Sequence, residues 1–312
     1  MQVQFYRALW GVNEDFEVLF PRLQMQGFAG VEVSLSSMGW PDKSKTDRFS
    51  QLRLKYGLKF LAGLYTAWDN YIGDWAPKTV EEHLMQFKRE LIAAKELGAF
   101  HCNSHSGGDN LSDDEAIQFF EGALAIEKEV GLTVSHETHR GRILYSPWRT
   151  YMLLKRLPTL RLTLDLSHWV VVSERFILNP TSPHYRQLLE LVASRVDHIH
   201  ARISTTQSSQ IDDPEATDGW DPICREEFDA VWQFIWDVQR KAGKRVITMD
   251  VEYGPPEIDD GGYQRNVMWV AETVNGQHVV KKRPAKVLND LVVTEKSRLE
   301  RKFSAWKSAH KL

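Results

Sequence analysis

The feature that most constrains the fold of this chain is a repeated alternation of short β-rich runs with longer segments of helical period. The runs are rich in Val, Ile, Leu or Phe, and most are bounded by turn residues. The predicted strands are Gln2–Leu9, Gly30–Leu35, Lys59–Tyr65, Phe100–Ser104, Leu132–Glu137, Arg161–Leu166, Asp197–Arg202 and Arg245–Val251. About eight strand–helix units in roughly 270 residues agree in number and length with a single-domain (β/α)₈ barrel of the α/β class.

The segments between the strands carry the capping chemistry of helices. Thr79 and Glu82 are spaced as a capping box, and Ser112 and Glu115 repeat the device in a segment that ends at Gly131. The rival architecture, a doubly wound open sheet, needs a glycine-rich phosphate-binding turn after its first strand. The stretch ALWGVNED at that place has one glycine, so we favour the barrel.

Composition excludes several classes of protein. The chain has 312 residues, of which 42% are hydrophobic and 26% charged, and a net charge of -3. No Lys/Arg-dense tract precedes residue 281, which argues against a nucleic-acid partner. Two cysteines, no apolar run long enough to span a membrane and no signal peptide predict a soluble cytoplasmic protein. The expected partner is a small-molecule substrate, without nucleic acid or membrane, and a homo-oligomer is possible.

Two segments depart from the alternation. Ser204–Pro222 is a long polar loop after the seventh strand, and loops of that length in compact domains are often functional. We expect it to close over a ligand, mobile when the site is empty. Residues 1–262 are predicted to form the barrel, and residues 263–312 a final barrel helix followed by a basic helical tail that is solvated or faces a partner.

Polar side chains gather where the strands of the second half end, which is the face of a barrel that holds active sites. These candidates are Asn103, His105 and Asp109 after the fourth strand, Glu137, His139, Arg140 and Arg142 after the fifth, Asp165 and His168 after the sixth, His198, His200 and Arg202 on the seventh, and Asp250, Glu252 and Tyr253 on the eighth. The strands of the first half are followed by the aromatic residues Trp10, Trp40 and Trp68. Two Glu, one Asp and one neutral imidazole form an oxygen-rich set that suits Mn²⁺, with Mg²⁺, Co²⁺ or Zn²⁺ as alternatives.

In this order, the residues resemble the xylose isomerase-like TIM-barrel superfamily, which includes sugar epimerases, a dehydratase group and the endonuclease IV group (AP endonuclease family 2). The resemblance implies that one divalent metal ion is held by Glu137, Asp165, His200 and Glu252, and that His168 contacts the substrate or a metal-bound water. HETHRGR, DLSHWVVVSER and VEYGPP are similar to one subgroup of the superfamily rather than to the epimerases proper. The Ser204–Pro222 loop lacks the Asp-x-His metal motif of the endonuclease group, which argues against a nuclease.

Several candidates have a second interpretation. Glu137 and Asp165 could belong to a structural ion-pair network with arginines, and Asp250 could replace Glu252 as the ligand from the eighth strand. His198 is expected one layer deeper than His200, as a core residue or a support for the ligands. Asp109 could simply cap its loop. The expected substrate contacts are His105, His139, Arg140, Arg142, Arg202 and Trp10, although the arginines could only balance carboxylates and the tryptophans could only pack.

The predicted function is that of a divalent-metal-dependent isomerase or epimerase of a small hydroxy-carbonyl compound, a sugar or a sugar acid. Glu137, Glu252 and His168 are the predicted catalytic residues, with proton abstraction next to a carbonyl and a metal-stabilised enediolate. A dehydratase or lyase could use the same site. A barrel that binds a ligand without catalysis is the alternative from another class.

Overall fold

A computed structural model describes residues 1–66, 76–211, 213–217, 219–254, 269–274, 277–282 and 288–311. Eight strands form a closed barrel in which each strand pairs with its neighbours in chain order, and β8 pairs with β1. All the barrel pairs are parallel, so the predicted (β/α)₈ barrel is confirmed. The strands are β1 (Gln2–Ala8), β2 (Gly30–Ser34), β3 (Lys59–Tyr65), β4 (His101–His105), β5 (Val134–Glu137), β6 (Leu162–Asp165), β7 (Val196–His200) and β8 (Val246–Asp250).

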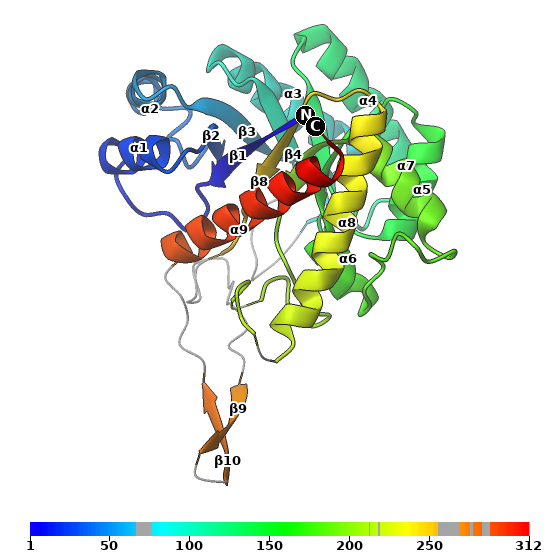
Figure 1. Ribbon diagram of the computed structural model, residues 1–312. Helices are drawn as coiled ribbons and strands as arrows, with labels where there is room; N and C mark the ends of the chain where they lie inside the picture. The colour runs from blue at the N-terminus through cyan, green and yellow to red at the C-terminus, as the bar shows by residue number, and fades with distance from the viewer. Residues whose placement is uncertain are drawn as a thin grey trace.

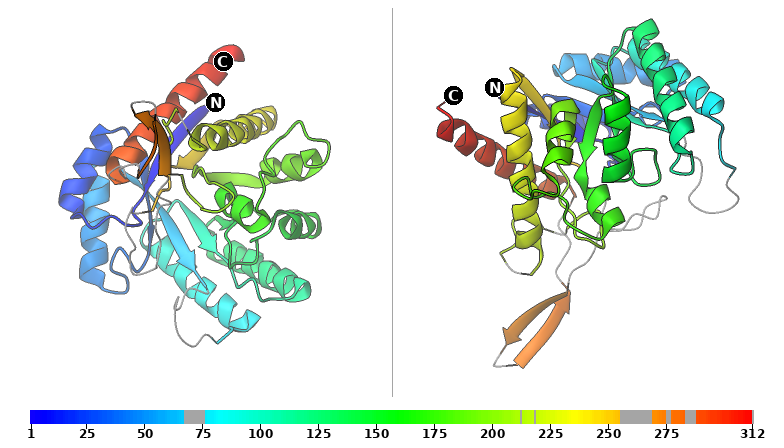
Figure 2. Two further views of the ribbon diagram at one scale, coloured as in Figure 1. Left: turned by 90° about the horizontal axis from the view of Figure 1, so that it is seen from below. Right: turned by 90° about the vertical axis from the view of Figure 1, so that its right-hand side faces the viewer.

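Helices surround the strands in a ring, as Figure 2 shows in its left view. They are α1 (Phe16–Met25), α2 (Lys43–Lys55), α3 (Val80–Glu96), α4 (Asp113–Val130), α5 (Pro147–Arg156), α6 (Leu166–Ser173), α7 (Arg186–Arg195), α8 (Asp221–Lys241) and α9 (Leu288–Ala309). None of the helices in the described part of the chain is long and apolar enough to cross a membrane.

The local chemistry of the helix ends is as the sequence predicts. Thr79 with Glu82, and Ser112 with Glu115, form complete capping boxes at the starts of α3 and α4. Gly131 ends α4 with a φ of 70°, a left-handed conformation that favours glycine. These capping residues mark where α3 and α4 begin and where α4 ends. Each helix then returns the chain to the amino end of the next strand.

The apolar core lies between the strands and the helices, whereas the inside of the barrel is largely polar. On β4, Cys102 belongs to the apolar core, and His101 forms hydrogen bonds with Thr133 and Ser135. Ser135 in turn contacts the Thr163 hydroxyl on β6 at 2.6 Å. Polar side chains therefore stack inside the barrel and lead to its carboxyl end, where the loops after the strands begin.

The end of the chain differs from the prediction. Trp269–Val274 and Gln277–Lys282 are strands, β9 and β10, which pair antiparallel and stand clear of the barrel in Figure 1. Asn275–Gly276 separates the two runs, and this dipeptide is the strongest short-range hairpin signal. The expected final barrel helix therefore does not start in this apolar stretch.

The basic segment is helical, as predicted, and this helix, α9, packs on the barrel as the last helix of the ring. Its apolar side chains Leu291, Leu299 and Phe303 are buried, because they recur at helical spacing and face the barrel. Arg298 of α9 donates two hydrogen bonds of 2.8 Å to Asp229 of α8. The helix itself was predicted from the sequence, but its packing against the barrel was not.

Candidate functional site

Four side chains meet at the carboxyl end of the barrel. Glu137, Asp165 and His200 are the last residues of β5, β6 and β7, and Glu252 lies two residues beyond β8. Each offers a ligand atom, and these atoms all lie within 4.8 Å of one another. The first three residues are buried, and the side chain of Glu252 is 15% exposed. The structure thus brings together the four residues that the sequence predicts as metal ligands.

Three of these residues have a buried polar atom without a hydrogen bond: Oε1 of Glu137, Nδ1 of His200 and Oε2 of Glu252. The imidazole Nδ1 lies 3.2 Å from Oε2 of Glu252 and 3.7 Å from Oε1 of Glu137. Buried polar atoms are rarely left unsatisfied, because their desolvation is costly. Two carboxylate oxygens and one imidazole nitrogen that turn to a common point form a donor set that fits a divalent cation.

Asp165 is held differently from the other three. Its Oδ1 accepts the backbone N–H of Ser167 at 2.8 Å, and its Oδ2 accepts the Arg202 guanidinium at 2.5 Å. The same guanidinium nitrogen lies 2.6 Å from Nε2 of His168 and 3.4 Å from Oε2 of Glu252. Arg202 therefore supplies positive charge at the corner of the cluster between Asp165 and Glu252.

The His200 imidazole lies among three carboxylates that determine its pKa. Burial alone would lower its pKa, but the carboxylates of Glu32, Glu137 and Glu252 outweigh this effect and raise the pKa well above its ordinary value. Burial would likewise raise the pKa of Glu252, which Arg202 and His200 instead bring below its ordinary value. The imidazole and its carboxylates therefore stabilise one another's charged forms.

The pKa values of the other two carboxylates shift in opposite directions. Burial would raise the pKa of Glu137, but His105 and His200 hold it well below its usual range. For Asp165, the effect of burial is larger than the opposing effect of the Arg202 charge, and the pKa is raised to about 6. Glu137 is thus an ionised group available as a base at neutral pH.

A row of imidazoles runs from the cluster along one wall. His105 places Nε2 2.8 Å from Oε2 of Glu137. Its ring lies 4.6 Å from that of His139, which lies 3.7 Å from that of His168. Burial lowers the pKa of His139 and His168 well below the ordinary value, and neighbouring positive groups lower it further. Both rings are therefore neutral and able to form hydrogen bonds with a polar ligand.

The cluster opens onto a cavity of about 490 Å³, a volume in the range of small-molecule sites. Its wall includes His105, His139, Arg202 and Trp10 among the predicted substrate contacts, together with Trp40. The Trp10 ring packs directly on Gly254, where an added Cβ would lie 2.3 Å from the ring. It also lies under the guanidinium of Arg202, 5.9 Å from the ring centre.

Two predicted contacts are not part of this wall as the structure describes it. Arg140 and Arg142 are not among the described residues that line the cavity, and Arg142 is buried and donates to the Gly141 carbonyl at 3.1 Å. Their role toward a substrate stays a prediction. Trp68 and the Pro-Pro pair of VEYGPP lie outside the described residues.

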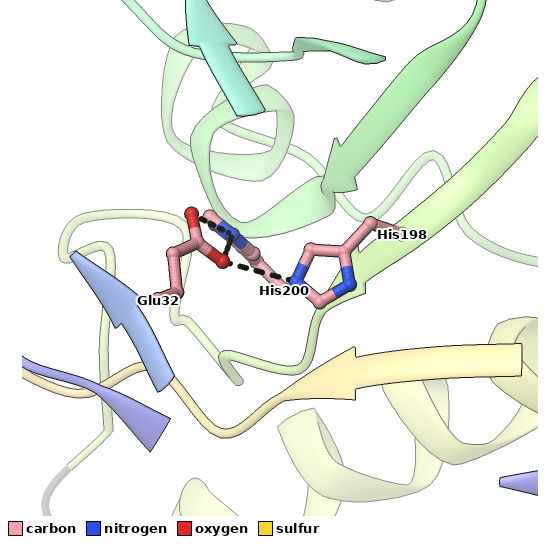
Figure 3. Close-up of side chains that lie close together, drawn as sticks. All are labelled: Glu32, His198 and His200. Carbon is pink, nitrogen blue, oxygen red and sulfur yellow. Dashed lines mark hydrogen bonds and ion pairs between the residues drawn. The ribbon is translucent and has the colours of Figure 1, made fainter. Parts of the chain in front are cut away.

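Glu32 on β2 belongs to the site but is not among the residues predicted from the sequence. Its carboxylate lies inside the barrel, 3.0 Å from Nε2 of His198 and 3.1 Å from Nε2 of His200 (Figure 3). The available signal was an acidic residue between Val31 and Val33 in a strand expected to be buried on both faces. His198 is one layer deeper than His200, as predicted, and supports Glu32.

Asp250, the alternative ligand from the eighth strand, faces a different group. Its Oδ1 accepts the backbone N–H of Ala8 at 3.0 Å, and burial raises its pKa well above the ordinary value. A neutral carboxyl is a poorer metal ligand than an ionised one. Glu252 is therefore the better candidate, in agreement with the sequence-based choice.

The described part of the Ser204–Pro222 loop is packed against the barrel. Ser209, Gln210 and Ile211 are buried, and the Gln210 side-chain oxygen accepts the backbone N–H of Gly254 at 2.8 Å. The backbone N–H of Ile211 donates to the Ile203 carbonyl at 2.9 Å. The first half of the loop is thus anchored next to the end of β8, and its expected mobility stays a prediction.

Comparison with known proteins places this architecture in a family. Solved structures that share the fold include an L-ribulose 3-epimerase, with a TM-score of 0.62 and 12% identity, over 99% of this chain and 97% of that chain. They also include the probable 3-DHS dehydratase AsbF of Bacillus anthracis, with a TM-score of 0.54 and 15% identity, over 80% of this chain and 92% of that one. D-psicose 3-epimerase of Clostridium cellulolyticum H10, solved with D-tagatose, has a TM-score of 0.53 and 12% identity, over 81% and 86%.

At these identities the likeness shows the fold alone. A comparison with curated proteins found no match. The model of the xylose isomerase-like TIM barrel family matches residues 20–231, which is more than half of the chain. The chain belongs to the xylose isomerase-like TIM barrel family.

Proposed function

We propose that this protein is a divalent-metal-dependent isomerase or epimerase of a small hydroxy-carbonyl compound, a sugar or a sugar acid. The observation that carries the proposal is the cluster of Glu137, Asp165, His200 and Glu252, with three buried atoms that lack hydrogen bonds and turn to one point. The cluster opens onto a cavity of suitable size, and two of the solved structures with this fold are named as sugar epimerases.

In this proposal the four residues hold one divalent ion, with Mn²⁺ favoured. Bound there, the ion would act as a Lewis acid toward the oxygens of a hydroxy-carbonyl group. Glu137 and Glu252 come from β5 and β8, so a substrate between them presents a different face to each. Both carboxylates have lowered pKa values and are ionised at neutral pH, as a proton acceptor must be.

The proton chemistry then follows from the side chains. One glutamate accepts the proton from the carbon next to the carbonyl, and the other returns a proton on the opposite face. The neutral His139 and the cationic Arg202, which line the cavity, form hydrogen bonds with substrate oxygens and orient them, and the buried His168 holds the Arg202 guanidinium through Nε2 at 2.6 Å. Trp10 also lines the cavity, and its ring packs on the Arg202 guanidinium, 5.9 Å from the ring centre.

Metal analysis and exchange in heavy water test the proposal. Chelator-treated protein is loaded with MnCl₂, and bound manganese is measured by elemental analysis. We expect about one equivalent in the wild type and in Asp109→Asn, an exposed carboxylate control, and much less in His200→Ala. Loaded protein is then incubated with ketoses and keto sugar acids in heavy water, and the α-proton is followed by NMR.

Deuterium in recovered substrate together with its epimer supports the proposal. Loss of water from the substrate without exchange would show a dehydratase instead. Wild-type protein that takes up less than a tenth of an equivalent of manganese would overturn the metal site.

A further inference from the structure

Glu32 reaches the candidate site from the opposite side of the barrel. It lies on β2. Its carboxylate oxygen lies 3.0 Å from Nε2 of His198 and 3.1 Å from Nε2 of His200, and both histidines belong to β7 (Figure 3). Asn103 of β4 donates to it at 2.9 Å. The residue is 8% exposed, so a buried carboxylate is satisfied by three side chains from two other strands.

These contacts decide which nitrogen of His200 faces the cluster. Nε2 is directed at Glu32, and Nδ1 is directed at Glu137 and Glu252 without a hydrogen bond of its own. When a metal ion takes the place of the proton on one nitrogen, an imidazole that still donates from the other nitrogen presents that freed lone pair to the ion. A ring rotated about its χ2 angle would turn Nδ1 away from the two glutamates.

The two residues that hold Glu32 in place, His198 and Asn103, are themselves fixed by further hydrogen bonds. His198 has its Nδ1 2.8 Å from the Thr248 hydroxyl of β8, which holds the ring with Nε2 toward Glu32. The amide nitrogen of Asn103 also donates to Glu137 at 2.6 Å, so one side chain spaces the two carboxylates. Glu32 therefore has little freedom to move away from His200.

We propose that Glu32 is a positioning residue that holds the His200 imidazole with Nδ1 toward Glu137 and Glu252, and thereby sets the affinity of the cluster for a divalent ion. This inference rests on the proposed function, because it concerns the same cluster. It adds a residue from the half of the barrel that contributes none of the four ligands.

Binding of Mn²⁺ and Co²⁺ to a graded set of variants tests the inference. Glu32→Gln keeps the size and one accepting oxygen but loses the charge, and Glu32→Leu removes both. Removing an orienting group of a ligand typically weakens metal binding by about 10- to 100-fold. By titration calorimetry with MnCl₂, we expect Kd to rise about 10-fold in Glu32→Gln and about 100-fold in Glu32→Leu. The control is Glu127→Gln, which removes a carboxylate 3.1 Å from the buried His136 outside the cluster, and its Kd should stay unchanged.

The visible spectrum of the Co²⁺-loaded protein separates positioning from simple charge or folding effects. Loss of a properly oriented imidazole changes the bands, so the spectrum of Glu32→Leu should move toward that of His200→Ala. Weaker binding with an unchanged spectrum would overturn the inference, and so would wild-type affinity in both Glu32 variants. If Glu32→Leu does not fold, Glu32→Gln alone decides. A wild-type protein that binds neither ion overturns the proposed function together with this inference, which is a different result from wild-type binding that does not depend on Glu32.

Discussion

Arg202 donates a hydrogen bond to Asp165 at 2.5 Å, although Asp165 is one of the four residues grouped around the proposed metal position. The pairing follows from strand register, because Asp165 pairs with His200 across β6 and β7, and Arg202 lies two residues further along. The same guanidinium is 3.4 Å from Glu252. It supplies fixed positive charge to a cluster of carboxylates and would repel a cation bound among them.

The first prediction concerns this guanidinium. Arg202→Met should bind Mn²⁺ roughly ten-fold more tightly, because a like charge near the ion is removed. Without metal, it should be less stable by about 3–5 kcal/mol, since Asp165 loses its buried partner. Titration calorimetry and urea unfolding with and without MnCl₂ measure both effects. Arg7→Met is the matched control, because Arg7 is equally buried at 2% exposure, and its Mn²⁺ affinity should be unchanged. Weaker metal binding in Arg202→Met would mean that the guanidinium holds Asp165 in place as a ligand.

The second prediction separates proton transfer from metal binding. Glu137→Gln and Glu252→Gln keep a coordinating oxygen but cannot accept a proton. Each should retain appreciable Mn²⁺ and lose about 10²–10⁴-fold in kcat, the usual contribution of a general acid or base. One of the two should still exchange the substrate α-proton in heavy water without inverting the carbon, which NMR detects. If both variants bind metal and turn over at near the wild-type rate, the carboxylates are only ligands.

The barrel could be predicted because its signals are local. Capping boxes such as Thr79 with Glu82 and the order of strands and helices are legible within short windows of sequence. The four clustered residues could be found for a related reason: each lies at or just past the end of a strand, and parallel strands bring these ends together.

Glu32 could not be predicted in the same way, because its role depends on contacts between distant residues. It is 166 residues from His198 in sequence, and only the closed barrel brings them to 3.0 Å. Arg202 was predicted to contact substrate, but its position beside Asp165 depends on the register of two strands. The pairing of β9 with β10 differs from these two cases, because Asn275–Gly276 is a local hairpin signal that can be read from the sequence alone.

The third prediction tests whether α9 belongs to the barrel. Arg298 is buried and bonded to both Asp229 and Glu295, and losing one partner of such a network typically costs about 3–5 kcal/mol. Arg298→Met should therefore lower the free energy of unfolding by that amount. Arg301→Met on the same helix is the control, because its side chain is 66% exposed and an exposed ion pair contributes at most about 1 kcal/mol. Equal stabilities of the two variants in urea would contradict the packing described for α9.

The last prediction concerns stability at acid pH and uses an ion pair at the other end of the barrel. Asp197, near the start of β7, accepts hydrogen bonds from Arg161 at 2.9 and 2.6 Å and from Lys244 at 3.1 Å. These residues precede β6 and β8, so one carboxylate ties the amino ends of three strands. Burial would raise its pKa, but the two cations outweigh burial and lower it from 3.8 to about 2.

Because the folded protein binds this proton more weakly than the unfolded chain, the pair stabilises the fold fully at pH values above about 4. The contribution is about 2 kcal/mol, and it is lost as the pH falls toward 2. Asp197→Asn should therefore be less stable than the wild type by about 2 kcal/mol at pH 7, and the difference should shrink steadily below pH ~4. Urea unfolding at a series of pH values measures it, with Asp47→Asn as the control, since Asp47 forms a surface pair with Lys43 and is 50% exposed. A difference that stays constant down to pH ~2.5 would show that the loss in Asp197→Asn comes from packing or neutral hydrogen bonds rather than from the charge of this carboxylate.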